Sequence, residues 1–344
     1  MKQHVRGRWW WVLIAVALLV MVAGCAAGNE ESNTVQDRTP DDGEDYSDED
    51  DWGWGEHGSP GGANDDDDDD TAGDDDTAAD DDDDNDDDDA TYTPPDGIEM
   101  IFFDVDQGDA ALLRFPQGST MLIDAGGNQM GRLVVYPYLQ SINLDTIDVM
   151  VASHADADHV GGLDDLMERV DVGELWWNGR DKDTVTWQEV VDLADELSIP
   201  MVEVERGDYF EIDGCSVEVY NADQPEFEDH NADSVVLYVD CEAVGALLTG
   251  DVTEGAQEGL IDEYGAALAA EIVKVPHHGS PDRSSDFPSF VQAEYAVFSY
   301  GTDNPYGHPN ANVVQEWEDV GAAIYKTAED GDVTFLIKNG NITV

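Results

Sequence analysis

The chain has 344 residues, and its 80 Asp and Glu against 14 Lys and Arg give a formal net charge of −66 at pH 7. This charge excludes a conventional DNA- or RNA-binding protein, because affinity for phosphates comes from basic side chains that release counterions. Residues 98–344 hold 49 of the acidic and 10 of the basic residues, and residues 1–97 hold the others.

The N-terminus has the pattern of an export signal. Three basic residues precede an unbroken apolar run over residues 9–24, and Cys25 follows it. This run is shorter than the ~20 apolar residues of a membrane-spanning helix. It ends in Val-Ala-Gly-Cys, which resembles a lipobox, where the cysteine is lipidated and becomes the new N-terminus. We therefore expect residues 1–25 to be an export signal and Cys25 to attach a lipoprotein to lipid on the extracellular face of the cell membrane, an uncleaved anchor being the alternative.

The next segment, residues 26–97, is dominated by Gly, Ser, Thr, Pro and Asp, with unbroken aspartate runs at 65–70, 80–84 and 86–89. It has too little apolar surface to offset the entropy of ordering, and its charges repel one another. We expect a disordered acidic tether. Calcium binding is the less favoured alternative, because calcium loops need glycine and oxygen ligands in a fixed geometry.

Residues 98–344 are predicted to form one folded domain, long enough to bury a full core. Strands are predicted over 98–105, 110–115, 120–123, 147–153, 174–177, 201–204, 215–220, 234–239, 245–248, 271–275, 295–299, 323–326 and 332–337. Helices are predicted over 162–170, 186–197, 255–264 and 310–320. Hairpins in blocks with helices between them predict an α+β fold of two sheets packed face to face with helices outside, and not a doubly wound parallel sheet.

The strand predicted at 147–153 leads into a loop rich in potential metal ligands. His154, Asp156, Asp158 and His159 fall within six residues, ahead of a Gly-Gly turn. Loops at strand ends can direct several side chains to one point. Four such residues in one short loop favour a metal site over isolated turn or capping residues.

This His-x-Asp-x-Asp-His-x-Gly-Gly run resembles the metal-binding motif of the metallo-β-lactamase fold, in the variant with aspartate at the second histidine position. Further segments resemble, in the same order, the soluble hydrolase domain of the DNA-uptake channel ComEC and its stand-alone relatives. They are DVDQGDA at 104–110, LIDAG at 122–126, NADSVVL at 231–237, LLTGD at 247–251, KVPHHGS at 274–280 and NPYGHP at 304–309. Asp106 departs from this pattern, because the family has glycine there. The resemblance covers essentially all of residues 98–344 and implies a four-layer αββα sandwich.

The resemblance also implies two divalent metal ions in a groove at the sheet edge, with Asp251 bridging them. The implied ligands are His154, Asp156, Asp158, His159, Asp251 and His277. Three carboxylates make this set richer in oxygen than a usual zinc site, which leaves zinc and manganese both open. Asp104 and Asp124 are expected to orient a histidine ring or a loop, or else to serve a structural turn.

Two such ions would lower the pKa of a bridging water and supply hydroxide at neutral pH, which suits a phosphodiester substrate. Asp158 is expected to be essential for cleavage. Lys274, His278 and His308 are candidates to neutralise the negative charge that develops, and the two histidines stay open between ligand and leaving-group roles.

The function implied is a secreted, surface-anchored phosphodiesterase or nuclease that acts on extracellular DNA, as a monomer and with DNA-uptake machinery as a possible partner. The alternatives are hydrolysis of another ester, such as a lactone, a thioester or a cell-wall phosphoester, and a surface binding module with a vestigial metal site.

The net charge of −39 on residues 98–344 opposes ordinary affinity for DNA. Near 1 M salt the Debye length is only about 3 Å, so this repulsion is largely screened. Carboxylates spread over a whole folded domain are what a salt-rich habitat favours, and we predict a halophilic protein. Cys215 and Cys241 fall on predicted strands, where they could pair outside the cell or stay as two buried thiols.

Overall fold

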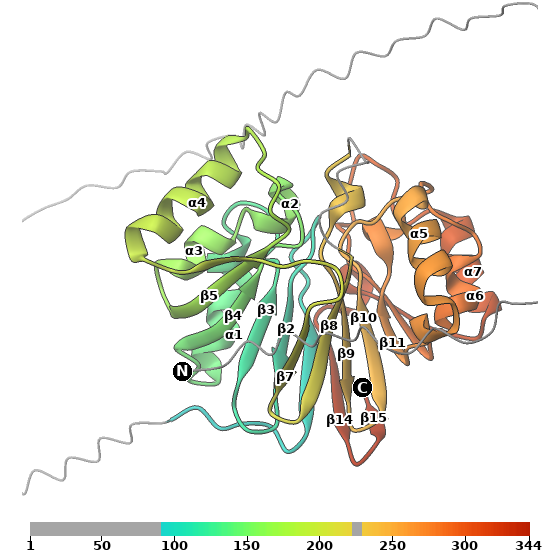
Figure 1. Ribbon diagram of the computed structural model, residues 1–344, viewed down its shortest axis with the longest axis horizontal. Coiled ribbons are helices and arrows are strands. Elements are labelled where there is room, and N and C mark those ends of the chain that lie inside the picture. The colour runs from blue at the N-terminus through green and yellow to red at the C-terminus, as the bar shows by residue number, and fades with distance from the viewer. Residues whose placement is uncertain (1–90, 222–228) are drawn as a thin grey trace, which may run out of the picture. The chain divides into compact units, whose positions relative to one another are not determined.

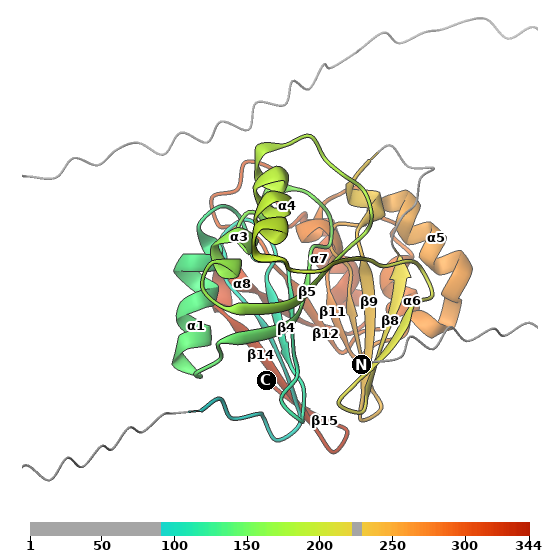
Figure 2. The ribbon, with the colours of Figure 1, turned by 60° about the vertical axis from the view of Figure 1, so that its left-hand side comes forward.

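The computed structural model describes residues 91–221 and 229–344. The predicted export signal, Cys25 and nearly all of the acidic tether lie outside the described residues. Two mixed β-sheets pack face to face, and helices cover the outer face of each (Figure 1). A view turned by 60° shows the same layers from the side of helix α4 (Figure 2).

The first sheet has eight strands in the order β15-β14-β1-β2-β3-β4-β5-β6. Their bounds are β1 Ile98–Phe102, β2 Ala111–Arg114, β3 Thr120–Ile123, β4 Thr146–Val151, β5 Asp171–Trp177, β6 Met201–Glu203, β14 Val333–Lys338 and β15 Asn341–Thr343. Pairing is antiparallel from β15 to β3 and parallel from β3 to β6.

The second sheet has seven strands in the order β13-β12-β11-β10-β9-β8-β7. Their bounds are β7 Tyr209–Ile212, β8 Cys215–Asn221, β9 Val236–Cys241, β10 Val244–Leu248, β11 Ile272–Lys274, β12 Tyr295–Phe298 and β13 Ala323–Lys326. Pairing is antiparallel from β7 to β10 and parallel from β10 to β13.

The helices form the two outer layers. The first sheet is covered by a π-helical turn Gly131–Val135 and by α1 Tyr136–Ser141, α2 Ala157–Val160, α3 Leu163–Met167 and α4 Val185–Leu197. The second is covered by α5 Glu254–Tyr264, α6 Phe287–Val291 and α7 Ala311–Asp319, while α8 Thr327–Asp330 follows β13. Short 3₁₀ turns lie at Asn231–Asp233, Gly265–Leu268 and Pro276–Gly279. No helix of the described part of the chain has the length and apolar character needed to cross a bilayer.

Three buried apolar clusters separate the four layers. Phe335 of the first sheet and Val217 of the second belong to the cluster between the sheets. Trp187 of α4 belongs to the cluster behind the first sheet, and Trp317 of α7 to the cluster behind the second. This arrangement confirms the predicted α+β sandwich with helices outside.

Every predicted strand is present, but the sequence missed two edge strands, β7 and β15. Both are partly exposed along their length, so they lack the buried apolar face by which a strand is recognised in a sequence. The four predicted helices are present as α3, α4, α5 and α7. The sequence did not predict α1, α2, α6 and α8, which have four to six residues and are too short to show a period. Cys215 and Cys241, left open by the sequence, form a disulfide between the adjacent strands β8 and β9.

Candidate metal centre

The first half of the site lies on the loop that joins β4 to α2. His154 and Asp156 lie in this loop, and Asp158 and His159 lie on α2 itself. A glycine lets another loop pack against them, because a Cβ atom on Gly108 would lie 2.1 Å from the backbone oxygen of Asp158. Gly108 also has φ +133°, a conformation that other residues rarely adopt.

The second half comes from the ends of β10 and β11 in the other sheet. Asp251 follows β10, and its backbone N–H donates to the hydroxyl of Ser234 at 3.1 Å. His277 and His278 lie in the turn after β11, with φ of 50° and 53°. Two consecutive left-handed residues that are not glycine carry backbone strain, and such strain concentrates at functional sites.

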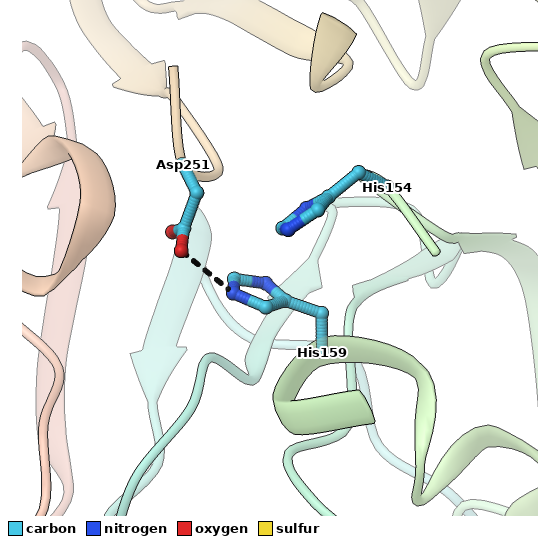
Figure 3. A group of neighbouring side chains, drawn as sticks. All are labelled: His154, His159 and Asp251. Atoms are coloured by element: carbon cyan, nitrogen blue, oxygen red, sulfur yellow. Dashed lines mark ion pairs between the residues drawn. The ribbon is translucent and has the colours of Figure 1, made fainter. Parts of the chain in front are cut away.

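These two halves meet at the edge where both sheets end. The Nε2 atom of His159 lies 3.2 Å from Oδ2 of Asp251, and Nε2 of His278 lies 3.1 Å from the same oxygen. The second ring also lies 3.4 Å from Oδ2 of Asp158. His154 stands beside His159, with ring centroids 4.2 Å apart, and Figure 3 shows both rings directed at Asp251.

Neighbouring groups hold the rings of His159 and His154. Nδ1 of His159 lies 2.8 Å from Oδ2 of Asp124, which can only accept, so Nδ1 donates. The same carboxylate accepts from the hydroxyl of Ser153 at 2.7 Å and from its backbone N–H at 2.8 Å. Because the Ser153 hydroxyl already donates its proton to Asp124, its oxygen can only accept from the ring of His154. Nδ1 of His154 lies 3.1 Å from this hydroxyl oxygen and is therefore the donor. Asp124 thus orients a histidine ring, one of the roles predicted for it.

The ring of His278 is held in the same way from the other sheet. Its Nδ1 lies 2.8 Å from the backbone oxygen of Ser299 and 3.3 Å from Oδ1 of Asp109. Asp109 is paired in turn with Lys274, whose Nζ atom lies 2.6 Å from Oδ2. All three rings therefore use Nδ1 as a donor and direct Nε2 into the cluster.

The buried polar atoms fit a divalent cation. Nε2 of His154 and Oδ1 of Asp251 are buried and have no hydrogen-bond partner among the described residues, which is rare for polar atoms in folded proteins. The only close partners of Nε2 of His159 and of His278 in the described part of the chain are carboxylate oxygens of the cluster. Four overlapping groups of three donors have ligand atoms within 4.8 Å of one another. They are His154, His159 and Asp251; Asp158, His159 and His278; Asp109, Asp251 and His278; and Asp109, Asp124 and His159.

The charged groups of the cluster shift one another's pKa values. Burial lowers the pKa of His159 and of His278, but the carboxylate of Asp251 and other acidic neighbours outweigh it, so both pKa values are raised well above the ordinary range. Burial raises the pKa of Asp251, yet the two histidines bring it well below its usual value. Burial and the charge of His159 lower the pKa of His154. The cluster therefore pairs positively charged rings with carboxylates.

Two predicted ligands lie at the rim. Oδ1 of Asp156 is 3.8 Å from Nε2 of His154 and 3.0 Å from Nζ of Lys182. Nε2 of His277 is 3.9 Å from Oδ2 of Asp251 and 3.3 Å from the side-chain nitrogen of Asn231. Among the described residues, neither Asp156 nor His277 belongs to a group of three close donors.

His278 lies closer to the cluster than His277 does, since their Nε2 atoms are 3.1 Å and 3.9 Å from Oδ2 of Asp251. His308 packs against both rings, with centroid distances of 6.3 Å and 5.6 Å. Burial, together with the charges of His278 and His277, lowers the pKa of His308 to about 4, so this ring is neutral at pH 7. It lies beside the cluster as a neutral polar group.

Two other predicted residues, Lys274 and Asp104, contact groups other than the three histidines and Asp251. Lys274 is buried against Asp109, and its ammonium group also donates to the backbone oxygen of Val275 at 2.9 Å, so it supports the cluster from behind. The carboxylate of Asp104 accepts from the backbone N–H of Asp106 at 3.3 Å and shapes the loop before β2. Asp109 is a further residue of the site, not predicted from the sequence, although it lies in the DVDQGDA segment at 104–110.

Comparisons with known proteins agree with this geometry. The family described as the metallo-beta-lactamase superfamily matches residues 103–287. ComE operon protein 3 of Bacillus subtilis is 26% identical over 262 residues, which are 70% of this chain and 33% of that protein. Competence protein ComA of Neisseria gonorrhoeae is 26% identical over 256 residues, which are 72% of this chain and 34% of that protein. The chain thus spans about a third of the length of these relatives.

Among solved structures, the metallo-beta-lactamase fold protein YhfI from Bacillus subtilis is 9% identical with a TM-score of 0.45, covering 72% of this chain and 99% of that one.

Proposed function

Because the chain belongs to the metallo-beta-lactamase superfamily, we propose that it is a metal-dependent phosphodiesterase or nuclease that acts on extracellular DNA. The superfamily consists mostly of metal-dependent hydrolases, and competence proteins are among the relatives of this chain. One observation carries the proposal: three buried histidines donate through Nδ1 and direct Nε2 at Asp251.

The residues proposed to hold two divalent ions are those of the cluster and its rim. They are His154, Asp156, Asp158, His159, Asp251, His277 and His278. Such ions supply Lewis-acid chemistry, lowering the pKa of water and offsetting negative charge on the attacked phosphate. The carboxylate-rich donor set supports manganese as well as zinc.

The protein's own groups prepare the site for this chemistry. Asp124 and the carbonyl of Ser299 fix which ring nitrogen faces inward, and outer partners of this kind raise the basicity of a metal-binding histidine. His308 is neutral at pH 7 and lies next to His278, and both observations support a role in exchanging a proton with a leaving group.

We also propose that the protein is exported and attached to the membrane surface through Cys25, with the acidic segment as a spacer. The lipobox-like sequence and the composition of residues 26–97 support this. A partnership with DNA-uptake machinery is part of the same proposal, supported by the competence relatives.

A panel of substrates tests the proposed activity. Purified protein at high salt with Mn²⁺ or Zn²⁺ is assayed with single- and double-stranded DNA, bis-p-nitrophenyl phosphate, a lactone and a β-lactam. We expect cleavage of the phosphodiesters, abolished in Asp158→Ala and retained in Asp165→Ala. The carboxylate of Asp165 faces Arg132 on the π-helical turn and Arg169 just after α3. Turnover of the lactone alone would identify a different esterase, and no turnover with either metal would identify a binding module.

A further inference from the structure

Lys182 lies beside the metal cluster and is one of only 10 basic residues in residues 98–344. We propose that Lys182 binds a non-bridging oxygen of the substrate phosphate. Before substrate binds, the ion pair with Asp156 keeps the lysine at the site, and binding of a divalent ion to the Asp156 carboxylate releases it. This inference rests on the proposed phosphodiesterase function and assigns a substrate-binding residue to the same site.

The geometry places one carboxylate oxygen between the lysine and the cluster. Nζ of Lys182 is 3.0 Å from Oδ1 of Asp156, and this oxygen is 3.8 Å from Nε2 of His154. The side chains of Lys182 and Asp156 are 28% and 27% exposed, whereas that of His154 is fully buried. The ammonium group therefore lies on the solvent side of the cluster, where a substrate enters.

The segment that carries Lys182 is anchored on both sides. It joins β5 to α4, and at its start the buried side chain of Asn178 donates to the backbone oxygen of Asp233 at 3.0 Å. Arg180 forms an ion pair with the carboxylate of Asp233. At its end the indole N–H of Trp187 donates to Asp181 at 3.2 Å. These contacts hold the backbone, so that only the four-carbon stem of the lysine needs to move.

The other lysines of the described chain serve different partners. Lys274 is buried against Asp109, Lys326 pairs with Glu329 at 3.0 Å, and Lys338 pairs with Asp96. In a domain with a net charge of −39, a phosphodiester meets repulsion nearly everywhere. A lysine placed at the cluster supplies a local positive charge where the phosphate has to lie.

One carboxylate oxygen cannot serve an ammonium group and a metal ion at the same time without bringing two positive charges together. Asp156 is one of the proposed metal ligands, so metal binding and the Lys182 pair compete for it. A lysine ammonium is a compact charge on a flexible stem, and it readily turns to another anion within reach. The phosphate oxygen of a bound substrate is that anion.

The metal half of the proposal is tested without substrate. Mn²⁺ alone is titrated into full-length wild type, Lys182→Met and the matched control Lys326→Met. We expect Lys182→Met to bind Mn²⁺ roughly two- to fivefold more tightly, the range for a partly exposed ion pair, and the control to bind as wild type does. Equal Mn²⁺ affinity in all three proteins would overturn the competition.

The substrate half is tested with bis-p-nitrophenyl phosphate at saturating Mn²⁺. Lys182→Met should raise KM roughly tenfold and change kcat less than KM. Lys182→Arg should have a KM close to that of wild type, because arginine keeps the positive charge. An unchanged KM in Lys182→Met, with an active wild type, would overturn the inference and leave the proposed function intact. No phosphodiester turnover by wild type would overturn both.

Discussion

Replacing Asp124 by asparagine removes one acceptor and one charge behind the metal cluster. The carboxylate is buried and accepts three hydrogen bonds of 2.7–2.8 Å, from the ring of His159 and from the backbone and hydroxyl of Ser153. An asparagine presents N–H groups to one of these donors, so His159 loses its fixed orientation. Changes to such outer partners typically lower metal affinity about 10- to 100-fold, or about 1.4–2.7 kcal/mol. We expect this range for Asp124→Asn.

The assay is a competition titration of Mn²⁺ or Zn²⁺ against a chromophoric chelator, with thermal unfolding of the metal-free protein alongside. Asp148→Asn is the matched control, because Asp148 also accepts from a backbone N–H on a neighbouring strand, that of Thr120 at 2.9 Å, without touching the cluster. We expect the control to lose no metal affinity. If Asp124→Asn binds metal within twofold of wild type, the role given to the carboxylate is refuted.

Further outcomes follow from the same geometry. His278→Ala should reduce metal affinity and activity far more than His277→Ala, measured by the same titration, and the reverse order would contradict the assignment of the inward-facing ring. Because the pKa values of His159 and His278 are raised well above the ordinary range, metal-free protein carries protons there at pH 7. Metal binding should therefore release protons and weaken as pH falls, seen by calorimetry in two buffers of different ionisation enthalpy. Lys274→Met should destabilise the fold by about 3 kcal/mol in denaturant titrations, because the buried carboxylate of Asp109 loses its ion pair with the lysine and keeps only the ring of His278. Lys274→Met combined with Asp109→Asn should recover part of that stability. If the protein is halophilic, it should be folded at salt concentrations of about 1 M or more and unfold when the salt is diluted, as measured by circular dichroism. A protein that is stable only at low salt would contradict the halophilic prediction.

The sequence predicted the central strands and the longer helices because their apolar faces repeat with the period of the element that buries them. It failed at β7 and β15, whose edge positions leave both faces partly exposed. The sequence also predicted the metal-ligand loop after β4, since its four candidate ligands are close together in the chain: His154, Asp156, Asp158 and His159. Local patterns therefore predicted what depends on local order.

The sequence did not predict contacts between segments that are far apart in the chain. Asp109 and His278 are 169 positions apart, and no local pattern shows that the carboxylate faces that ring at 3.3 Å. Likewise, only the packing of the segment after β5 against the loop after β4 brings Lys182 to Asp156.

By itself the sequence determined the family, the two-sheet fold and the kind of residue that gathers at the site. The tertiary structure decided which histidine of the 277–278 pair turns inward, that Lys274 supports the cluster from behind, and that Cys215 bonds to Cys241. The physical reason is that residue identity and periodicity act within a few neighbours along the chain. Ligand geometry, by contrast, depends on where two separate sheets bring their strand ends together.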